Sequence, residues 1–358
     1  MQNKPRDVRY CGCNRKRIRA AKPELNITNL EHLHEFITER YRIHLEKDVY
    51  KSPAPWTDDP VLRNFRFTNV RREHDRETKW LIENIVNKKG LSYEDKLLNI
   101  VLFRLFNKHE TAELLHMPIP FSTYKSWNPE LYRKIFDEEK RTNPKAKFFT
   151  GAFNTGGLKR ALKWYLPEDD PENSMEMRVM YFMKYLMRNK LVKKLESCEN
   201  QQEIFECLSS FMGIGEFLGY QMFVDMTYIP EFPFSENHFV VAGPGCKMGL
   251  DYLFIDKDGM SYEECLFWLR DNIDYLFQEV IQKHWEPQLL FRDLPSEDRH
   301  MNVMSLENCF CELSKYIRAK TGTGRPRKLY RPTKENWYES NRFFRPCGSL
   351  CSKKKRLP

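Results

Sequence analysis

The chain has 358 residues, of which 41% are hydrophobic and 14% aromatic, so it can bury a substantial core and is not disordered for most of its length. It contains no run of eighteen uncharged apolar residues, and no apolar stretch follows the basic N-terminal residues. These features exclude a membrane span and a secretory signal. The sequence predicts a soluble protein, built from one large domain or from two closely packed ones.

The positive charge is concentrated at the two ends of the chain. Residues 1–22 contain eight Lys or Arg and one acid, and residues 315–358 contain fourteen and two, so the middle carries a net charge of −10 within a total of +9. Two basic ends on an acidic body are typical of a protein that grips a polyanion. The short run Lys353 to Arg356, taken alone, also fits a solubilising or nuclear-targeting tail.

Apolar residues repeat at helical spacing through the middle of the chain. Alternating β patterns are scarce, and the one strand-length apolar run near a Gly/Pro boundary, 239–241, is too short to build a sheet. We therefore predict an all-α fold, with a basic N-terminal arm over 1–22, a helical domain over 23–320 and a basic C-terminal tail over 321–358. The expected helices include 30–45, 97–105, 179–186 and 262–280.

The ten cysteines are scattered along a chain that is too large to need disulfides, so we expect reduced thiols. Cys11, Cys13, Cys347 and Cys351 could together bind zinc. Neither pair has the usual two-residue gap, and no histidine pattern supports the site. Free thiols are the preferred interpretation.

The first segment with candidate chemistry runs from Pro55 to Arg76. Asn69, Arg72, Glu73 and Arg76 are three or four residues apart, which would place them on one helical face. Guanidinium groups on such a face can hold phosphates or pair with the acids. Composition alone favours a solvated salt-bridge face.

The second segment, about 203–229, has the pattern of a helix-hairpin-helix element. Two apolar helical runs flank Gly213-Ile214-Gly215, and the glycines allow a sharp turn that presents backbone N–H groups to a DNA phosphate. An ordinary helical hairpin gives the same pattern.

The third segment begins with Glu236 and continues into a glycine-rich turn that contains Gly243, Gly245 and Lys247. Such a stiff turn can approach a phosphate or a flipped base closely. Glu236 lies beyond the second helix at a distance comparable to that of the essential acid in hairpin-containing DNA glycosylases. A purely structural loop is the alternative.

Three stretches together resemble a known family. PWTDDPVLRNFRFTNVRREHDR, the AGPG turn and residues 307–318 look like the 5-hydroxymethyluracil DNA kinase helical domain, over about 30–320. That family is similar to alpha-glutamyl/putrescinyl thymine pyrophosphorylases and, more distantly, to helix-hairpin-helix DNA glycosylases. The resemblance implies a viral, all-helical enzyme that modifies a hydroxymethylated thymine in double-stranded DNA inside the host cell.

The resemblance also implies the site residues. It suggests ATP and Mg²⁺ as cofactors and no metal bound by the protein itself. The phosphate-binding loop motif GxxxxGK[ST] does not occur in the chain, and the nearest candidate, Gly151 to Lys159, lacks the last part of the motif. A separate P-loop kinase is therefore an expected partner. The candidate catalytic residues are Asp59, Glu73, Glu236, Glu312 and Lys315, and the candidate DNA or phosphate contacts are Arg66, Asn69, Arg72, Arg76, Gly213, Gly215, Gly243, Gly245 and Lys247.

Several functions stay open at this point. The protein could help to phosphorylate 5-hydroxymethyluracil, or replace a phosphate or pyrophosphate on the thymine 5-methylene with an amine. A DNA glycosylase and a non-catalytic DNA-binding module are the rivals. For the enzymes, we expect the candidate acids and arginines to converge on one cleft beside the hairpin. Alternatively, Arg72, Glu73, Glu312 and Lys315 are buried salt bridges that lock the helices together.

Overall fold

The structure, a computed structural model, describes residues 13–123, 127–151, 156–165, 174–324, 326, 329 and 330. Almost all regular structure in this part of the chain is helical, which confirms the predicted all-α fold. The α-helices are α1 Arg15–Ala20, α2 Ile27–His44, α3 Pro60–Asn64, α4 Arg76–Leu81, α5 Tyr93–Phe106, α6 His109–Leu114, α7 Glu130–Thr142, α8 Gly156–Ala161, α9 Met175–Arg188, α10 Leu191–Glu196, α11 Gln201–Ser209, α12 Gly215–Met226, α13 Pro244–Leu253, α14 Tyr262–Tyr275, α15 Pro287–Leu290 and α16 Val303–Lys320.

The helices predicted from periodicity are present as α2, α5, α9 and α14, and polar caps fix where several of them begin. Asn26 caps α2 and Ser92 caps α5, each by accepting a hydrogen bond from a backbone N–H of the first turn. Ser261 and Glu264 form a reciprocal capping box at the start of α14. Short π-helical turns extend three of the helices, at Leu45–Val49, Ile82–Val86 and Leu276–Val280.

The strands lie elsewhere than the apolar run at 239–241. β1 (Glu24–Leu25) pairs antiparallel with β2 (Phe254–Asp256), and together they form the two-stranded sheet of the described residues. Residues 239–241 are not a strand, and Phe239 and Val240 are buried in the core.

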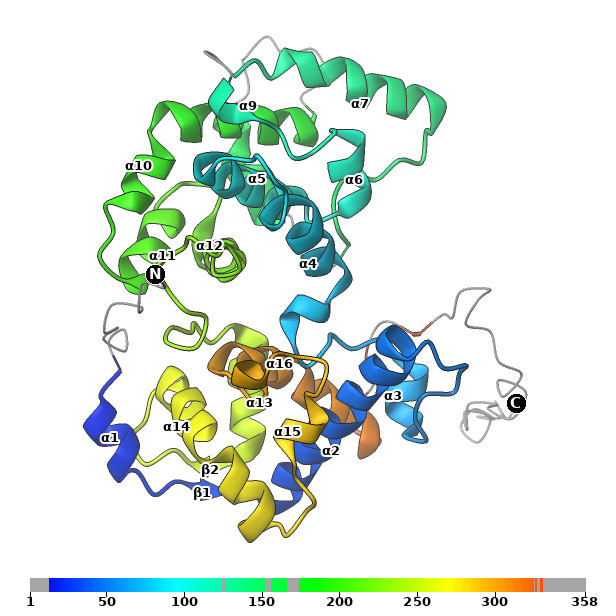
Figure 1. Cartoon of the computed structure of the whole chain (residues 1–358), viewed down its shortest axis with the longest axis vertical. Helices are drawn as coiled ribbons and strands as arrows, with labels where there is room; N and C mark the ends of the chain where they lie inside the picture. The colour runs from blue at the N-terminus through cyan, green and yellow to red at the C-terminus, as the bar shows by residue number, and fades with distance from the viewer. Residues whose placement is uncertain are drawn as a thin grey trace, which may run out of the picture.

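The helices form two halves joined by one continuous hydrophobic core (Figure 1). One half contains α4 to α12, from a single stretch of chain. The other contains α1 to α3 and α13 to α16, so it combines the beginning and the end of the described chain. The chain crosses between the halves at residues 65–75 and returns at 227–243. The residues on these two crossings meet the start of α16.

The α11–α12 hairpin lies in the first half and turns sharply at two glycines. Gly213 and Gly215 have φ angles of 118° and 62°, which residues with a side chain rarely adopt. A Cβ on Gly213 would lie 2.6 Å from Leu162 Cδ2. The predicted helix, tight turn and helix are therefore present.

A buried ion pair anchors α12 to α5. The Arg104 guanidinium binds both carboxylate oxygens of Asp225, and it also donates a 2.9 Å hydrogen bond to Thr78 Oγ1 in α4. Arg104 and Asp225 are almost completely buried. The geometry is bidentate, so it fixes the orientation of the two helices as well as their distance.

The glycine-rich turn at 243–249 is the start of α13, which packs closely against α16. A Cβ on Gly249 would lie only 2.1 Å from the Phe310 carbonyl oxygen, and a Cβ on Gly245 would be in ordinary contact with Cys311. We expected Gly245 to approach a phosphate. Instead it faces the neighbouring helix, because glycines four residues apart share a helical face and allow two helix backbones to approach.

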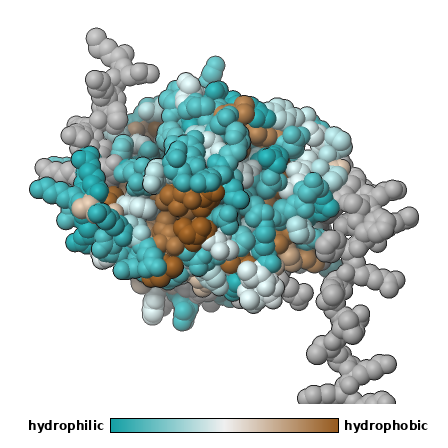
Figure 2. Space-filling view, turned by 90° about the horizontal axis from the view of Figure 1, so that it is seen from below, coloured by the Kyte–Doolittle hydropathy of each residue, from teal (hydrophilic) through white to brown (hydrophobic). Residues whose placement is uncertain are grey.

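No helix in the described part of the chain combines the length and the apolar character needed to cross a membrane. The face seen from below is mostly hydrophilic, with an apolar area near its centre (Figure 2). Most of the predicted basic arms, residues 1–12 and 331–358, lies outside the described residues, as do Cys11, Cys347 and Cys351.

Candidate active site at the junction of the two halves

The first crossing between the halves, residues 65–75, is not one helix as the spacing suggested. It is irregular up to a short 3₁₀ turn, Arg72–His74, after which Asp75 leads into α4. Asn69 and Asp75 cause the difference: Asn69 N donates to Asp75 Oδ1 at 2.8 Å, and Asn69 Nδ2 donates to the His74 carbonyl. This local bonding competes with the helix, so Asn69, Arg72, Glu73 and Arg76 do not share one helical face.

Arg71 is the buried centre of the junction. Its Nε donates to Glu73 Oε1 at 2.7 Å, and its Nη2 lies 3.6 Å from Glu236 Oε1. Its Nη1 donates to the His300 carbonyl at 3.2 Å. One guanidinium therefore holds an acid from each of the two crossings and the loop that precedes α16.

The second acid, Glu236, is held by the start of α16. Asn302 caps that helix through Oδ1, and its Nδ2 donates to Glu236 Oε1. The next residue, Asn237, accepts a 3.0 Å hydrogen bond from the backbone N–H of Val303. Burial raises the pKa of Glu236 to about 7, the charge of Glu73 adds to this, and Arg71 opposes it. The carboxyl is therefore divided between its two protonation states near neutral pH.

Several buried polar atoms at the junction have no hydrogen-bond partner among the described residues, and three of them matter for the site. They are Glu73 Oε2, Arg72 Nε and Tyr228 Oη. Buried polar atoms are almost always satisfied in folded proteins, so these atoms mark a place for water or for polar groups of a ligand. We call Arg71, Glu73, Glu236, Asn302 and Tyr228 the junction cluster.

Arg72 faces the other side of the junction, toward α12 and α16. Its Nη2 donates to Gln221 Oε1 on α12, and the charge of the buried Glu307 on α16 also acts on it. Burial raises the pKa of Glu307, which Arg72 partly offsets. Asn69 joins the same region, because its carbonyl accepts a 2.6 Å hydrogen bond from Asn308 Nδ2. Arg72 and Asn69 thus connect the helices around the junction.

The other predicted catalytic residues form separate contacts. Glu312 and Lys315 pair with each other at 2.7 Å within α16, so this pair does not join two helices as the salt-bridge alternative required. Asp59 caps α3 through Oδ1, and its Oδ2 accepts a 2.6 Å hydrogen bond from Tyr316. It borders an open groove of about 1270 Å³ beside α2. The structure therefore brings Glu73 and Glu236 together but gives Asp59 and the Glu312–Lys315 pair partners of their own.

The remaining predicted DNA contacts are spread over the surface. Arg66 is exposed, and Lys247 lies over the ring of Tyr262. Arg76, the first residue of α4, is exposed, pairs with Glu77 and borders a cavity of about 390 Å³. Gly243 precedes α13 and lies beside Glu307.

Sequence reasoning missed Arg71, Asn302 and Tyr228. Arg71 was inside the recognised stretch, but the helical assumption placed its neighbours on the reactive face. Asn302 carries an ordinary helix-start signal, Asn before an apolar run, and nothing in that signal indicates its contact with Glu236. Tyr228 follows the hairpin with no pattern of its own.

ATP and Mg²⁺ do not fit the junction cluster. Glu73 and Glu236 already flank the Arg71 guanidinium, so a positive group lies between the two acids. Among the residues that the structure describes, the two groups that could hold a metal each contain histidine, whereas Mg²⁺ prefers oxygen ligands alone. A nucleotide would therefore need residues from outside this cluster.

Comparison with known proteins identifies the family. The family model for "5-hmdU DNA kinase, helical domain" matches residues 28–325. A curated relative, the 5-hmdU DNA kinase of Bacillus phage SP10, is 25% identical over 302 residues, which cover 78% of this chain and 44% of the relative. The chain thus spans less than half of that relative's length, and no solved structure matches. Because the family model covers most of the sequence, this chain belongs to the family of 5-hmdU DNA kinase helical domains.

Proposed function

We propose that this chain is the base-recognising helical component of a 5-hydroxymethyluracil DNA kinase. The observation that carries the proposal is the family match over residues 28–325, a range that includes the junction cluster. The relative named as a 5-hmdU DNA kinase supports the same substrate and reaction. The bound DNA is double-stranded and contains the modified thymine.

The junction cluster offers suitable chemistry for the hydroxymethyl group. A carboxylate with a pKa near 7 can accept the hydroxyl proton at neutral pH, and we assign this role to Glu236. Arg71 supplies positive charge beside it, while Glu73 Oε2 and Tyr228 Oη can hydrogen bond to an extruded base. The Gly213–Gly215 hairpin and the basic ends would contact the DNA backbone.

The phosphoryl donor requires a second part. The chain has no Walker A sequence, and the relative is more than twice as long as the matched region. We therefore assign ATP and Mg²⁺ to a P-loop kinase, on a separate chain or a further domain, which would bind the nucleotide and neutralise its charge. In this arrangement the helical chain presents the base and removes the proton.

The test is competition binding followed by nucleoside mass spectrometry. The full chain should bind duplex DNA with 5-hydroxymethyluracil more tightly than the same duplex with thymine. Incubation with ATP-Mg²⁺ and amines then separates the reaction classes: one added phosphate supports the kinase, and an added amine supports the transferase alternative. Equal affinity for both duplexes, or release of free base, would overturn the proposal.

A further inference from the structure

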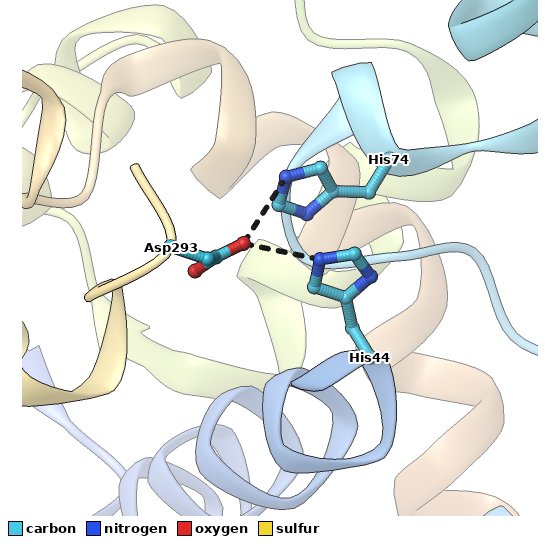
Figure 3. Close-up of side chains that lie close together, drawn as sticks. All are labelled: His44, His74 and Asp293. Carbon is cyan, nitrogen blue, oxygen red and sulfur yellow. Dashed lines mark hydrogen bonds and ion pairs between the residues drawn. The ribbon is translucent and has the colours of Figure 1, made fainter. Parts of the chain in front are cut away.

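Two histidines and an aspartate meet next to the junction cluster (Figure 3). His44 is the last residue of α2, His74 is the last residue of the 3₁₀ turn, and Asp293 lies in the loop after α15. Both imidazole rings direct a nitrogen toward the same carboxylate. Three segments far apart in the sequence thus converge on one point.

The spacing of the three groups suits a metal ion. His44 Nε2 lies 3.2 Å from Asp293 Oδ2, and His74 Nε2 lies 3.7 Å from the same oxygen. One ligand atom from each residue can be chosen so that all three lie within 4.8 Å of one another. In a tetrahedral site with bonds of about 2.0–2.1 Å, neighbouring ligand atoms are roughly 3.3 Å apart. The observed distances need only small side-chain movements to reach this value.

The surrounding residues support two of the three ligands. Asp48 Oδ2 lies 3.3 Å from His44 Nδ1, which leaves Nε2 of that ring to face the ion. Tyr41 donates a 2.6 Å hydrogen bond to Asp293 Oδ1 and leaves Oδ2 for the ion. Carboxylates and hydroxyls behind the ligands are the usual means of orienting metal-binding side chains.

The two imidazole rings would have to change their orientation to bind one ion. The two imidazoles are stacked, with centroids 3.8 Å apart and an angle of 13° between their planes. Each nitrogen lone pair lies in the plane of its ring, and two nearly parallel planes do not meet at one nearby point, so the rings must tilt to bind one ion. Buried His74 Nδ1 has no hydrogen-bond partner among the described residues, so no hydrogen bond on that nitrogen opposes the tilt.

We propose that His44, His74 and Asp293 bind a divalent transition metal ion, with zinc as the best match. Two imidazoles and one carboxylate favour such an ion over Mg²⁺ or Ca²⁺, and three protein ligands leave a fourth position for water. The proposal is independent of the kinase function. Its consequence is local: the ion would join the end of α2 to the turn that carries Arg71 and Glu73, because His74 directly follows Glu73.

The test uses Co²⁺, whose visible absorption bands report tetrahedral coordination. We expect the metal-free full chain to take up one equivalent of Co²⁺ with these bands and to lose them when Zn²⁺ is added. His74→Ala and Asp293→Asn should each weaken Co²⁺ binding at least tenfold. Asp293→Asn keeps the shape of the side chain and an oxygen for Tyr41, which limits its effect on folding.

The matched control is His109→Ala, in the second group that could hold a metal, Glu77, His109 and Glu110. This variant should bind Co²⁺ like the original chain. The proposal is overturned if the original chain shows no tetrahedral bands, or if only His109→Ala removes them. If a variant does not fold, a second measurement is used: the rise in melting temperature that zinc causes. This rise should be the same in the original chain and in His109→Ala.

Discussion

At the scale of single residues, the pKa of Glu236 is set mainly by burial and then by two neighbours with opposite effects. Burial is the largest influence and raises this pKa. The negative charge of Glu73 also raises it and the positive charge of Arg71 lowers it, which gives a pKa of about 7. An unfolded glutamate has a pKa of about 4.5. The folded protein therefore binds a proton at Glu236 that the unfolded chain releases between these two values.

The first prediction follows from this difference. Below pH 4.5 Glu236 is protonated in both states, and as the pH rises to 7 the folded state alone retains the proton, so stability falls. Above pH 7 Glu236 is ionised in both states, and the stability falls no further from this cause. Glu236→Gln should raise the free energy of unfolding by on the order of 2 kcal/mol at pH 8 and change it little at pH 4.5. Urea unfolding at both pH values measures this.

The same variant tests catalysis. Base modification by the complete kinase should fall at least a hundredfold in Glu236→Gln, because an amide cannot accept the proton, while binding to modified DNA is retained. In the original protein the rate should increase with pH, with a midpoint near 7. Retained activity would assign the proton transfer to another group.

The sequence predicted some of the acids that meet at the junction, and the structure shows why it could not separate them from the others. Glu73 and Glu236 were selected from the family resemblance, and the structure brings both to Arg71. Asp59 has the same chemistry and the same resemblance, but it caps α3. A carboxylate that caps a helix and one that faces a ligand are alike in the sequence, and only the tertiary contacts separate them.

At the scale of elements, apolar periodicity identified α2, α5, α9 and α14 because each buries apolar residues at helical spacing, but it did not predict α16, which is as long as α2. It failed at 65–75, where the spacing was helical but the Asn69–Asp75 hydrogen bonds hold the backbone in another shape. It also gave no information about partners. The packing of α13 on α16 joins residues that are more than fifty positions apart in the sequence. Local sequence patterns do not predict such a contact.

The second prediction concerns that packing. Gly249→Ala would place a methyl group against the Phe310 backbone and push α13 away from α16, at a cost of about 1–3 kcal/mol. Gly245→Ala is the matched control in the same helix, since its methyl group would be in ordinary contact with Cys311. It should change stability by less than about 1 kcal/mol. Equal losses in both variants would contradict the proposed close contact.

The third prediction concerns the anchor of the hairpin. Asp225→Ala leaves the Arg104 charge buried without its main partner, which should destabilise the protein by about 3–5 kcal/mol. Thermal unfolding measures the loss. Asp251→Ala, which removes an exposed pair with Lys257, should cost less than about 1 kcal/mol.

At the scale of the whole molecule, the basic ends are the predicted source of non-specific affinity, and the structure sharpens how to test them. Residues 15–20 form α1, where Ile18 is buried and Arg17 pairs with Glu264. At the other end, the Tyr330 backbone N–H donates to the Asn64 carbonyl. These residues belong to the packed structure, so deletions should be limited to 1–12 and 331–358.

The fourth prediction is that deleting 1–12 and 331–358 weakens DNA binding and flattens its salt dependence. Each lost phosphate contact should reduce the slope of log K against log salt by about 0.9. The preference for 5-hydroxymethyluracil over thymine should be unchanged, since the junction cluster is intact. If the deletion removed the preference for 5-hydroxymethyluracil and left the salt slope unchanged, the roles assigned to the ends and to the junction cluster would be wrong. Titrations at several salt concentrations provide the measurement.

The chain order of the two halves has a consequence for biosynthesis. One half, from α4 to α12, is a single uninterrupted stretch, and a ribosome completes it before α13 to α16 exist. The other half cannot close until α16 emerges and packs against α2, which was made more than 250 residues earlier. Such long-range closure is slow compared with local helix pairing. Arg71 and Glu236 also contact His300 and Asn302, which lie just before α16, so the candidate active site is complete only after the start of α16 has been synthesised.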